Sequence, residues 1–263
     1  MKILTHILLL FAVTNCFAQS KTVSLQLIAA QEVIADSYVG TDSFDNYYTI
    51  QNQVFKKKNK TAEFQYKNIA LGKIESTDLQ NPLQIVLFYK QMNAVVLLDN
   101  QLNETIKINF SETNPELFPT QVRLASQNRL WLYDQNSQKL GLYDFVKNHF
   151  QPITANIELP IVQSQSNYNY FYWTNNQLQL FASNIYGKIN LLGNLPEFDQ
   201  FELLSSTEIL LKKDNILSIY NCETKTSQII PTEEKSIKSF YYRDQILSIF
   251  TNEQIRTYKI ILP

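Results

Sequence analysis

The chain has 263 residues, of which 44% are hydrophobic and 13% aromatic, and its formal net charge is −1. This composition can form a sizeable core, and the balanced charge indicates no nucleic-acid partner. The two histidines and two cysteines are too few for a His-rich zinc site, a Cys/His nucleophile pair or a haem attachment, and five glycines exclude a Gly-rich phosphate loop.

The first 18 residues resemble a secretory signal peptide. An apolar run at residues 7–13 is followed by Cys16 and Ala18, which are small residues at the two positions that signal peptidase reads. The run is much shorter than the roughly 20 residues that cross a bilayer, so we expect no transmembrane segment in the mature chain. We predict cleavage after Ala18.

Residues 1–18 are therefore predicted to be a signal peptide and residues 19–263 a single secreted domain. Lipidation at Cys16 is the alternative, but Asn15 is a poor match to the small residue that normally precedes a lipidated cysteine. Either route leads to the periplasm or the outer membrane. Cleavage leaves Cys222 as the only cysteine, and we expect it to be a buried structural thiol.

From Val33 onward, a pattern of short strands and tight turns recurs about every 40 residues, a period typical of propeller blades. An apolar residue after a turn marks each of six copies, at Val54, Val95, Leu140, Leu178, Leu217 and Ile255. The predicted strands are, in chain order, 33–39, 47–50, 54–57, 62–66, 74–79, 83–89, 94–99, 105–110, 121–126, 129–134, 139–145, 149–153, 161–166, 170–173, 177–181, 188–192, 201–205, 208–212, 216–221, 226–230, 237–242, 246–250 and 255–262. The sequence thus predicts an all-β, six-bladed β-propeller with four-stranded antiparallel blades.

The last copy has only three strands. An open final blade would leave unpaired backbone donors and acceptors at its edge. The apolar segment 22–29 belongs to no other blade, so we predict that this N-terminal strand pairs with 255–262 and closes the last blade.

Asparagine stands at many predicted turns where glycine is usual. We expect these asparagines to supply the positive φ that tight turns need. They are Asn52, Asn93, Asn103, Asn136, Asn175, Asn176, Asn215 and Asn252.

Few residues offer catalytic chemistry. His149, the only histidine after cleavage, falls on the outermost strand of blade three, far from a propeller's axis. Asp42 and Asp45, like Asp134 and Asp144, are close in sequence, but strand-ending aspartates usually cap turns. We therefore predict no catalytic, cofactor-binding or metal-binding residues and no cofactor.

A basic run and an aromatic run have structural interpretations. Residues 56–60 contain four lysines, which we interpret as a solvated strand edge that resists aggregation, with lipid headgroups or a polyanion as the alternative ligands. Residues 168–173 place Tyr170 and Tyr172 on one strand face and Phe171 and Trp173 on the other. We expect both faces to fill the core, although stacked aromatics can also bind sugars or peptides.

The innermost strand of each blade lines a propeller's channel. The charged residues on these predicted strands are Asp36, Glu75, Asp78, Arg123, Glu202 and Lys238. They lie among serine, threonine and glutamine, so we predict a water-filled channel of mixed charge with no histidine and no perturbed acid–base pair.

Three segments carry a family resemblance: residues 81–89, residues 95–103 and the strand 130–134, together with the leader that ends Phe17-Ala18-Gln19. With the Asn/Lys/Ile-rich composition, they resemble uncharacterised secreted β-propeller proteins of the Bacteroidetes group. The resemblance implies a six-bladed fold outside the cytoplasm and supplies no catalytic residues. The Trp-Asp and Gly-His marks of the Trp-Asp repeat family are absent.

These features favour a non-catalytic binding or scaffold module, an accessory subunit of a cell-envelope or outer-membrane complex that contacts protein partners through its rim loops. This step rests on analogy between folds. A propeller enzyme of the quinoprotein, lactonase or glycoside-hydrolase type is the first alternative, and a carbohydrate- or peptide-binding propeller is the second.

Overall fold

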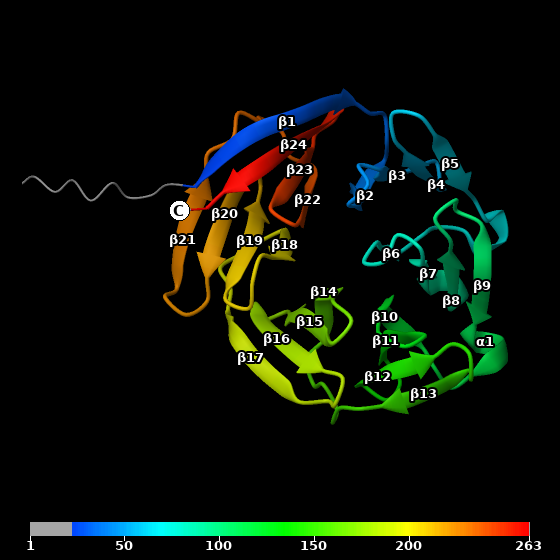
Figure 1. Cartoon of the computed structure of the whole chain (residues 1–263). Helices are drawn as coiled ribbons and strands as arrows, with labels where there is room; N and C mark the ends of the chain where they lie inside the picture. Colours follow the sequence, from blue (N-terminus) through cyan, green and yellow to red (C-terminus); the bar gives the residue numbers. More distant parts are fainter. Residues whose placement is uncertain (1–22, 263) are drawn as a thin grey trace, which may run out of the picture.

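Six four-stranded antiparallel sheets are arranged in a ring in the computed structural model, which describes residues 23–262 (Figure 1). The predicted six-bladed β-propeller is therefore confirmed. The predicted signal peptide, residues 1–18, lies outside the described residues.

Each blade is a meander whose first strand lies next to the channel and whose last strand lies on the circumference. The first three blades comprise β2 (Ser37–Thr41), β3 (Tyr47–Gln51), β4 (Val54–Lys58) and β5 (Glu63–Tyr66); β6 (Ser76–Asp78), β7 (Ile85–Tyr89), β8 (Ala94–Leu98) and β9 (Glu104–Asn109); and β10 (Pro119–Leu124), β11 (Arg129–Asp134), β12 (Lys139–Asp144) and β13 (His149–Pro152). The last three comprise β14 (Ile161–Ser166), β15 (Tyr170–Asn175), β16 (Gln179–Asn184) and β17 (Ile189–Asn194); β18 (Gln200–Leu203), β19 (Glu208–Lys213), β20 (Ile216–Asn221) and β21 (Thr226–Ile230); and β22 (Ser239–Arg243), β23 (Ile246–Phe250), β24 (Gln254–Ile261) and β1 (Ser24–Glu32). Within residues 23–262, helical structure is limited to α1 (Phe110–Thr113) and two 3-10 turns, Ile69–Leu71 and Lys90–Met92.

The N-terminal strand closes the ring, as the sequence predicted. β1 pairs antiparallel with β24, from Ser24 opposite Ile261 to Glu32 opposite Gln254, with one irregularity after Leu27. Val23, just before the strand, is buried in the apolar cluster between blades five and six. The segment thus supplies both the hydrogen bonds and part of the core that the three-stranded copy lacks.

The two middle strands of the blades form the core. All five residues of β7 and all five of β8 are buried, because both faces of these strands pack against neighbouring blades. This explains why they appear in the sequence as continuous apolar runs rather than as alternating ones. Separate apolar clusters fill the spaces between successive blades.

Several predicted strands begin or end two or more residues away from the observed bounds, and two of these differences have a clear cause. The first strand of blade one begins at Ser37, not at residue 33, because β1 continues to Glu32 and the chain must turn from the circumference to the channel before β2. Leu178, predicted to lie on the strand 177–181, lies instead in a turn with φ of 59°, and β16 begins at Gln179.

The asparagine prediction is correct only in part. Asn52 and Asn93 have positive φ, but at other turns a neighbouring residue has it, for example Leu102 and Asp214. Asn175 shows the other role, since its side-chain oxygen accepts hydrogen bonds from the turn N–H groups of Gln177 and Gln179. Such asparagines stabilise turns by accepting hydrogen bonds rather than by adopting the left-handed conformation.

The closure of the ring can be tested by deletion. Removing residues 19–30 should lower the free energy of unfolding by several kcal/mol, because burying Val23 alone contributes about 2 kcal/mol and most hydrogen bonds between β1 and β24 would also be lost. Denaturant unfolding measures this difference. Leu27→Ser, at a position 53% exposed on the same strand, is the control and should change stability little. An unaltered unfolding midpoint in the deletion variant would contradict closure.

Candidate functional site: the central channel

A cavity of about 990 Å³ runs along the axis of the propeller. It is lined by the first strands of the blades and by the loops that follow them, and blade one contributes only Val39. Most lining residues are neutral and polar, including Ser76, Gln121, Ser164 and Gln165. Among the described residues, the lining contains no histidine and no cysteine.

Four of the six charged residues predicted for the channel line it: Glu75, Asp78, Arg123 and Glu202. The other two do not. Asp36 accepts a hydrogen bond from the N–H of Asn52 in a turn (2.6 Å), and Lys238 is exposed, with its ammonium 5.4 Å from the centre of the Phe250 ring.

Two cations in the channel were missed. Arg243 is the last residue of β22, one position beyond the predicted strand, and Lys90 follows β7. Lys90 follows the second strand of its blade. Only first strands were expected to line the channel, so Lys90 was not predicted to lie there. Extending the predicted strand 237–242 by one residue would have found Arg243.

Asp78 and Arg123 join adjacent blades. The Asp78 carboxylate accepts hydrogen bonds from the backbone N–H groups of Leu124 in blade three and Gln80 in its own blade, both at 2.8 Å. The Arg123 guanidinium donates to the carbonyl of Thr77 in blade two (2.8 Å) and to that of Ser164 in blade four (2.7 Å). Both charged groups therefore have structural partners in the channel wall.

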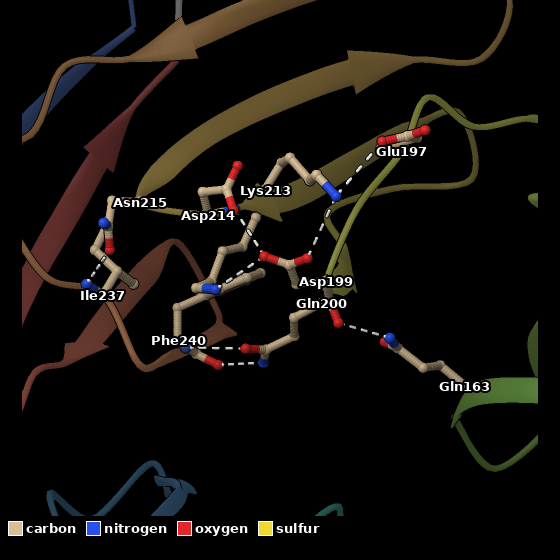
Figure 2. A network of polar contacts seen from close by, with 10 residues as sticks. Gln163, Glu197, Asp199, Gln200, Lys213, Asp214, Asn215, Ile237 and Phe240 are labelled. Carbon is tan, nitrogen blue, oxygen red and sulfur yellow. Dashed lines mark hydrogen bonds and ion pairs between the residues drawn. The ribbon is translucent and has the colours of Figure 1, made fainter.

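Two glutamines connect the next blades through their backbones. The Gln165 amide donates to the carbonyl of Phe201 (3.1 Å) and accepts from the N–H of Leu203 (3.0 Å). The Gln200 amide makes the same pair of bonds with Phe240 alone, at 2.6 and 3.2 Å (Figure 2). A primary amide has a donor and an acceptor at one end, so it can satisfy the free backbone edge of a neighbouring first strand.

Figure 2 also shows a charged network beside the second of these connections. Asp199 accepts from the N–H of Asp214 (2.7 Å) and lies 3.7 Å from the Lys213 ammonium, which also lies 3.5 Å from Glu197. The N–H of Asp214 is the main cause of a lowered pKa at Asp199. These groups are half-exposed or exposed, so the ion pairs contribute little stability. The network holds the linker between blades four and five in place and does not form a ligand-binding site.

Glu202 is the titratable group that stands out in the channel. Burial among the first strands raises the pKa of its carboxyl from 4.5 to about 8, although a hydrogen bond from Gln165 and the charge of Arg123 oppose the shift. The sequence predicted no perturbed acid–base pair in the channel, and it gave no indication of this single shifted carboxyl. Burial also raises the pKa of Tyr241, which lies close to Glu202 and Arg243.

The aromatic run fills the core on one face only. Phe171 and Trp173 are buried and contact Trp131 of blade three, as expected. On the other face, Tyr172 lines the cavity and Tyr170 is 40% exposed, so the expectation that both faces fill the core is wrong. Thr174, on the same face, is buried, so this face is open only toward the Tyr170 end of β15.

The lysine run is less solvated than predicted. Lys57 is buried, donates to the carbonyl of Asn100 in blade two (2.7 Å) and lies over the Tyr48 ring. Lys58 pairs with Glu63 (3.3 Å) on the next strand. The run thus helps to join blades one and two and also provides a charged edge.

The remaining candidates lie where the sequence indicated. His149 is exposed on the outer strand β13, and Cys222 is buried, which raises the pKa of its thiol. Asp42, Asp134 and Asp144 accept hydrogen bonds from the N–H groups of the turns that follow them.

The described residues contain no group of three or more histidine, cysteine, aspartate or glutamate side chains that could hold a metal ion. Within residues 23–262, no helix is long and apolar enough to cross a membrane.

Neither a protein-family model nor a curated protein sequence matches the chain. Many solved structures do. PorZ, a surface component of the type IX secretion system of Porphyromonas gingivalis, is 15% identical with a TM-score of 0.52 over 84% of this chain and 32% of its own. This chain thus spans about a third of the length of PorZ.

Two further solved structures match over nearly their whole length. Virginiamycin B lyase from Staphylococcus aureus is 10% identical with a TM-score of 0.56, over 89% of this chain and 99% of its own. BamB from Moraxella catarrhalis is 8% identical with a TM-score of 0.53, over the same shares. A variant of the lyase that lacks one histidine is catalytically inactive. At these identities, the similarity shows the propeller fold alone.

The shifted carboxyl gives a pH-dependent prediction. Between pH 4.5 and about 8, folded Glu202 keeps a proton that the unfolded chain releases, so its contribution to the free energy of unfolding falls as pH rises through this window. Glu202→Gln keeps an acceptor for Gln165 and removes the titration. We expect it to raise Tm by a few degrees at about pH 9 and to change Tm little at about pH 4.5.

Scanning calorimetry across this pH range measures the effect. Glu253→Gln, at an exposed carboxylate in the turn before β24, is the matched control and should give a small difference at every pH. Equal pH profiles for the two variants would contradict the raised pKa of Glu202.

Proposed function

We propose that this protein is an exported, non-catalytic β-propeller that binds protein partners as an accessory subunit of a cell-envelope or outer-membrane complex. The observation that carries the proposal is a set of exposed apolar and aromatic side chains on one face of the ring. They come from hairpin loops of blades one to four.

Strand direction places these loops at the same end. In a four-stranded meander, the loop between the first and second strands and the loop between the third and fourth lie on one side of the ring, because successive strands alternate in direction. Five apolar or aromatic residues in these two kinds of loop are 42–84% exposed: Phe44, Leu83, Val146, Tyr168 and Tyr186. We name this set the hairpin face.

The composition of the hairpin face suits a protein partner. Aromatic residues are enriched in the buried centres of protein interfaces, and exposed apolar groups gathered on one surface mark such sites. Tyr186, at 84% exposure, projects from a turn fixed by Gly187, where an added Cβ would lie 1.7 Å from the carbonyl oxygen of Ile153. That loop is therefore held in place while its aromatic side chain is left without a partner in the described chain.

The channel supports a non-catalytic role. Asp78, Arg123, Gln165 and Gln200 form bonds between blades, so these polar groups stabilise the ring. The lyase loses activity without one histidine, whereas His149 here lies on the outer surface of blade three. The enzyme alternative rests on Glu202, whose pKa of about 8 suits a general acid, but Asp78, another carboxylate in the cavity lining, already accepts two backbone hydrogen bonds.

Export rests on the predicted signal peptide, and the envelope assignment rests in addition on the resemblance to secreted Bacteroidetes propellers. PorZ is itself a surface component of a secretion system, which is consistent with a propeller of this kind acting in an envelope complex.

Affinity purification of tagged, cross-linked protein from the envelope of its native host tests the proposal. We expect the wild-type chain to retain a defined set of envelope proteins and the triple variant Phe44→Ser, Leu83→Ser, Tyr186→Ser to lose them. Truncating aromatic or aliphatic anchors at an interface centre commonly costs about 2 kcal/mol or more each.

The opposite face of the ring provides the matched control. Ile34→Ser, Ile69→Ser and Met92→Ser replace three residues with exposures of 85%, 80% and 48% on connections at the other side of the ring, and this variant should keep the same proteins. If both triple variants retain every captured protein, or if the wild-type chain captures none, the proposed function is wrong.

A further inference from the structure

Two arginines from different blades meet on one strand of the channel wall. Arg123 of blade three donates to the carbonyl of Thr77 (2.8 Å), and Arg243 of blade six donates to the carbonyl of Leu79 (3.3 Å). Both carbonyls lie on the channel edge of β6 and its continuation in blade two. Carbonyls two residues apart on an extended chain are separated by about 7 Å.

The geometry of blade one brings Arg243 across the ring. Blade one lies between blades six and two, but it contributes only Val39 to the cavity lining. Tyr241, two residues before Arg243, packs so closely on Gly40 of blade one that an added Cβ would lie 2.8 Å from its ring. This close approach lets the end of β22 reach past blade one to β6.

Neither guanidinium forms an ion pair with a carboxylate that lines the channel in the described structure, although the charge of Arg123 acts on Glu202. Among the described residues, Arg123 takes part in no ion pair, and Arg243 pairs only with Asp244 (3.5 Å), whose side chain is 80% exposed outside the cavity lining. The Asp78 carboxylate accepts from two backbone N–H groups instead. At neutral pH, the raised pKa of Glu202 keeps most of its carboxyl uncharged, so it compensates little of the positive charge.

Hydrogen-bond donors remain free on both arginines. A guanidinium has five N–H donors. Arg123 uses one donor on each of its three nitrogens, and Arg243 uses Nη1 for Leu79, while its Nη2 makes no hydrogen bond with a described residue. The Tyr241 hydroxyl, which also lines the cavity, likewise donates to no described residue.

We propose that the channel binds a small anionic molecule whose carboxylate or phosphate groups interact with Arg123 and Arg243. The planar fork of a guanidinium matches the oxygens of both groups, and a partly buried cation without a counter-charge is stabilised by an anion that supplies one. The cavity of about 990 Å³ admits a small molecule, and Tyr172 offers an aromatic surface to its uncharged part. Of the five residues of the hairpin face, only Tyr168 also lines this cavity.

Isothermal titration calorimetry of the intact mature protein with two probes, inorganic phosphate and glutarate, tests this site at constant ionic strength in chloride buffer. We expect saturable binding of one equivalent of at least one probe, and the stronger probe identifies whether phosphate or carboxylate is the preferred group. Arg243→Gln should weaken binding by about tenfold or more, and Arg243→Lys should weaken it less, because it keeps the charge and loses the fork.

Arg243 is the decisive position because its guanidinium makes one hydrogen bond in the described chain, so its replacement should leave the fold intact by circular dichroism. Arg123→Gln removes bonds to two neighbouring blades and adds evidence only if it folds. Lys188→Gln, which removes an exposed lysine outside the cavity, is the charge-matched control and should bind like the wild-type protein. Absence of saturable binding of both probes, or equal weakening by Lys188→Gln and Arg243→Gln, would overturn the proposal.

Discussion

The pairing of β1 with β24 is the constraint on which the ring depends. Blade six has three strands from the C-terminal end of the chain, and its fourth comes from Ser24–Glu32. Without this strand, the edge of β24 would be unpaired and the cluster around Val23 would be exposed on one side. Because β1 and β24, from opposite ends of the described chain, share one sheet, each blade is held between two neighbours.

A second set of contacts holds the blades together from inside. First strands have a free backbone edge toward the axis, and side chains of adjacent blades satisfy it: Asp78 bonds Leu124, Gln165 bonds Phe201 and Leu203, and Gln200 bonds Phe240. Polar residues on these strands therefore have a structural explanation. Two residues are exceptions: Arg243 keeps free hydrogen-bond donors, and Glu202 has a raised pKa. They distinguish the part of the wall where we propose a ligand site.

The sequence predicted the blade number and the closing strand because apolar runs of fixed spacing report local strand formation. The prediction failed where contacts between blades determine the burial or the pKa of a side chain. The burial of Lys57, the exposure of Tyr170 and the raised pKa of Glu202 all depend on which blade lies opposite, and the strand pattern carries no such information. Arg243 was missed for a simpler reason, since strand ends are the least certain part of a sequence-based assignment.

Hydrogen–deuterium exchange of the intact mature protein tests the closed ring most directly. The account predicts that the β1 amides bonded to β24 exchange as slowly as amides of the central strands β11 and β15, while the outward-facing amides of β1 exchange fast. Rapid exchange along the whole of Ser24–Glu32, with the central strands still protected, would mean that the N-terminal strand is not a stable part of blade six and would contradict the account.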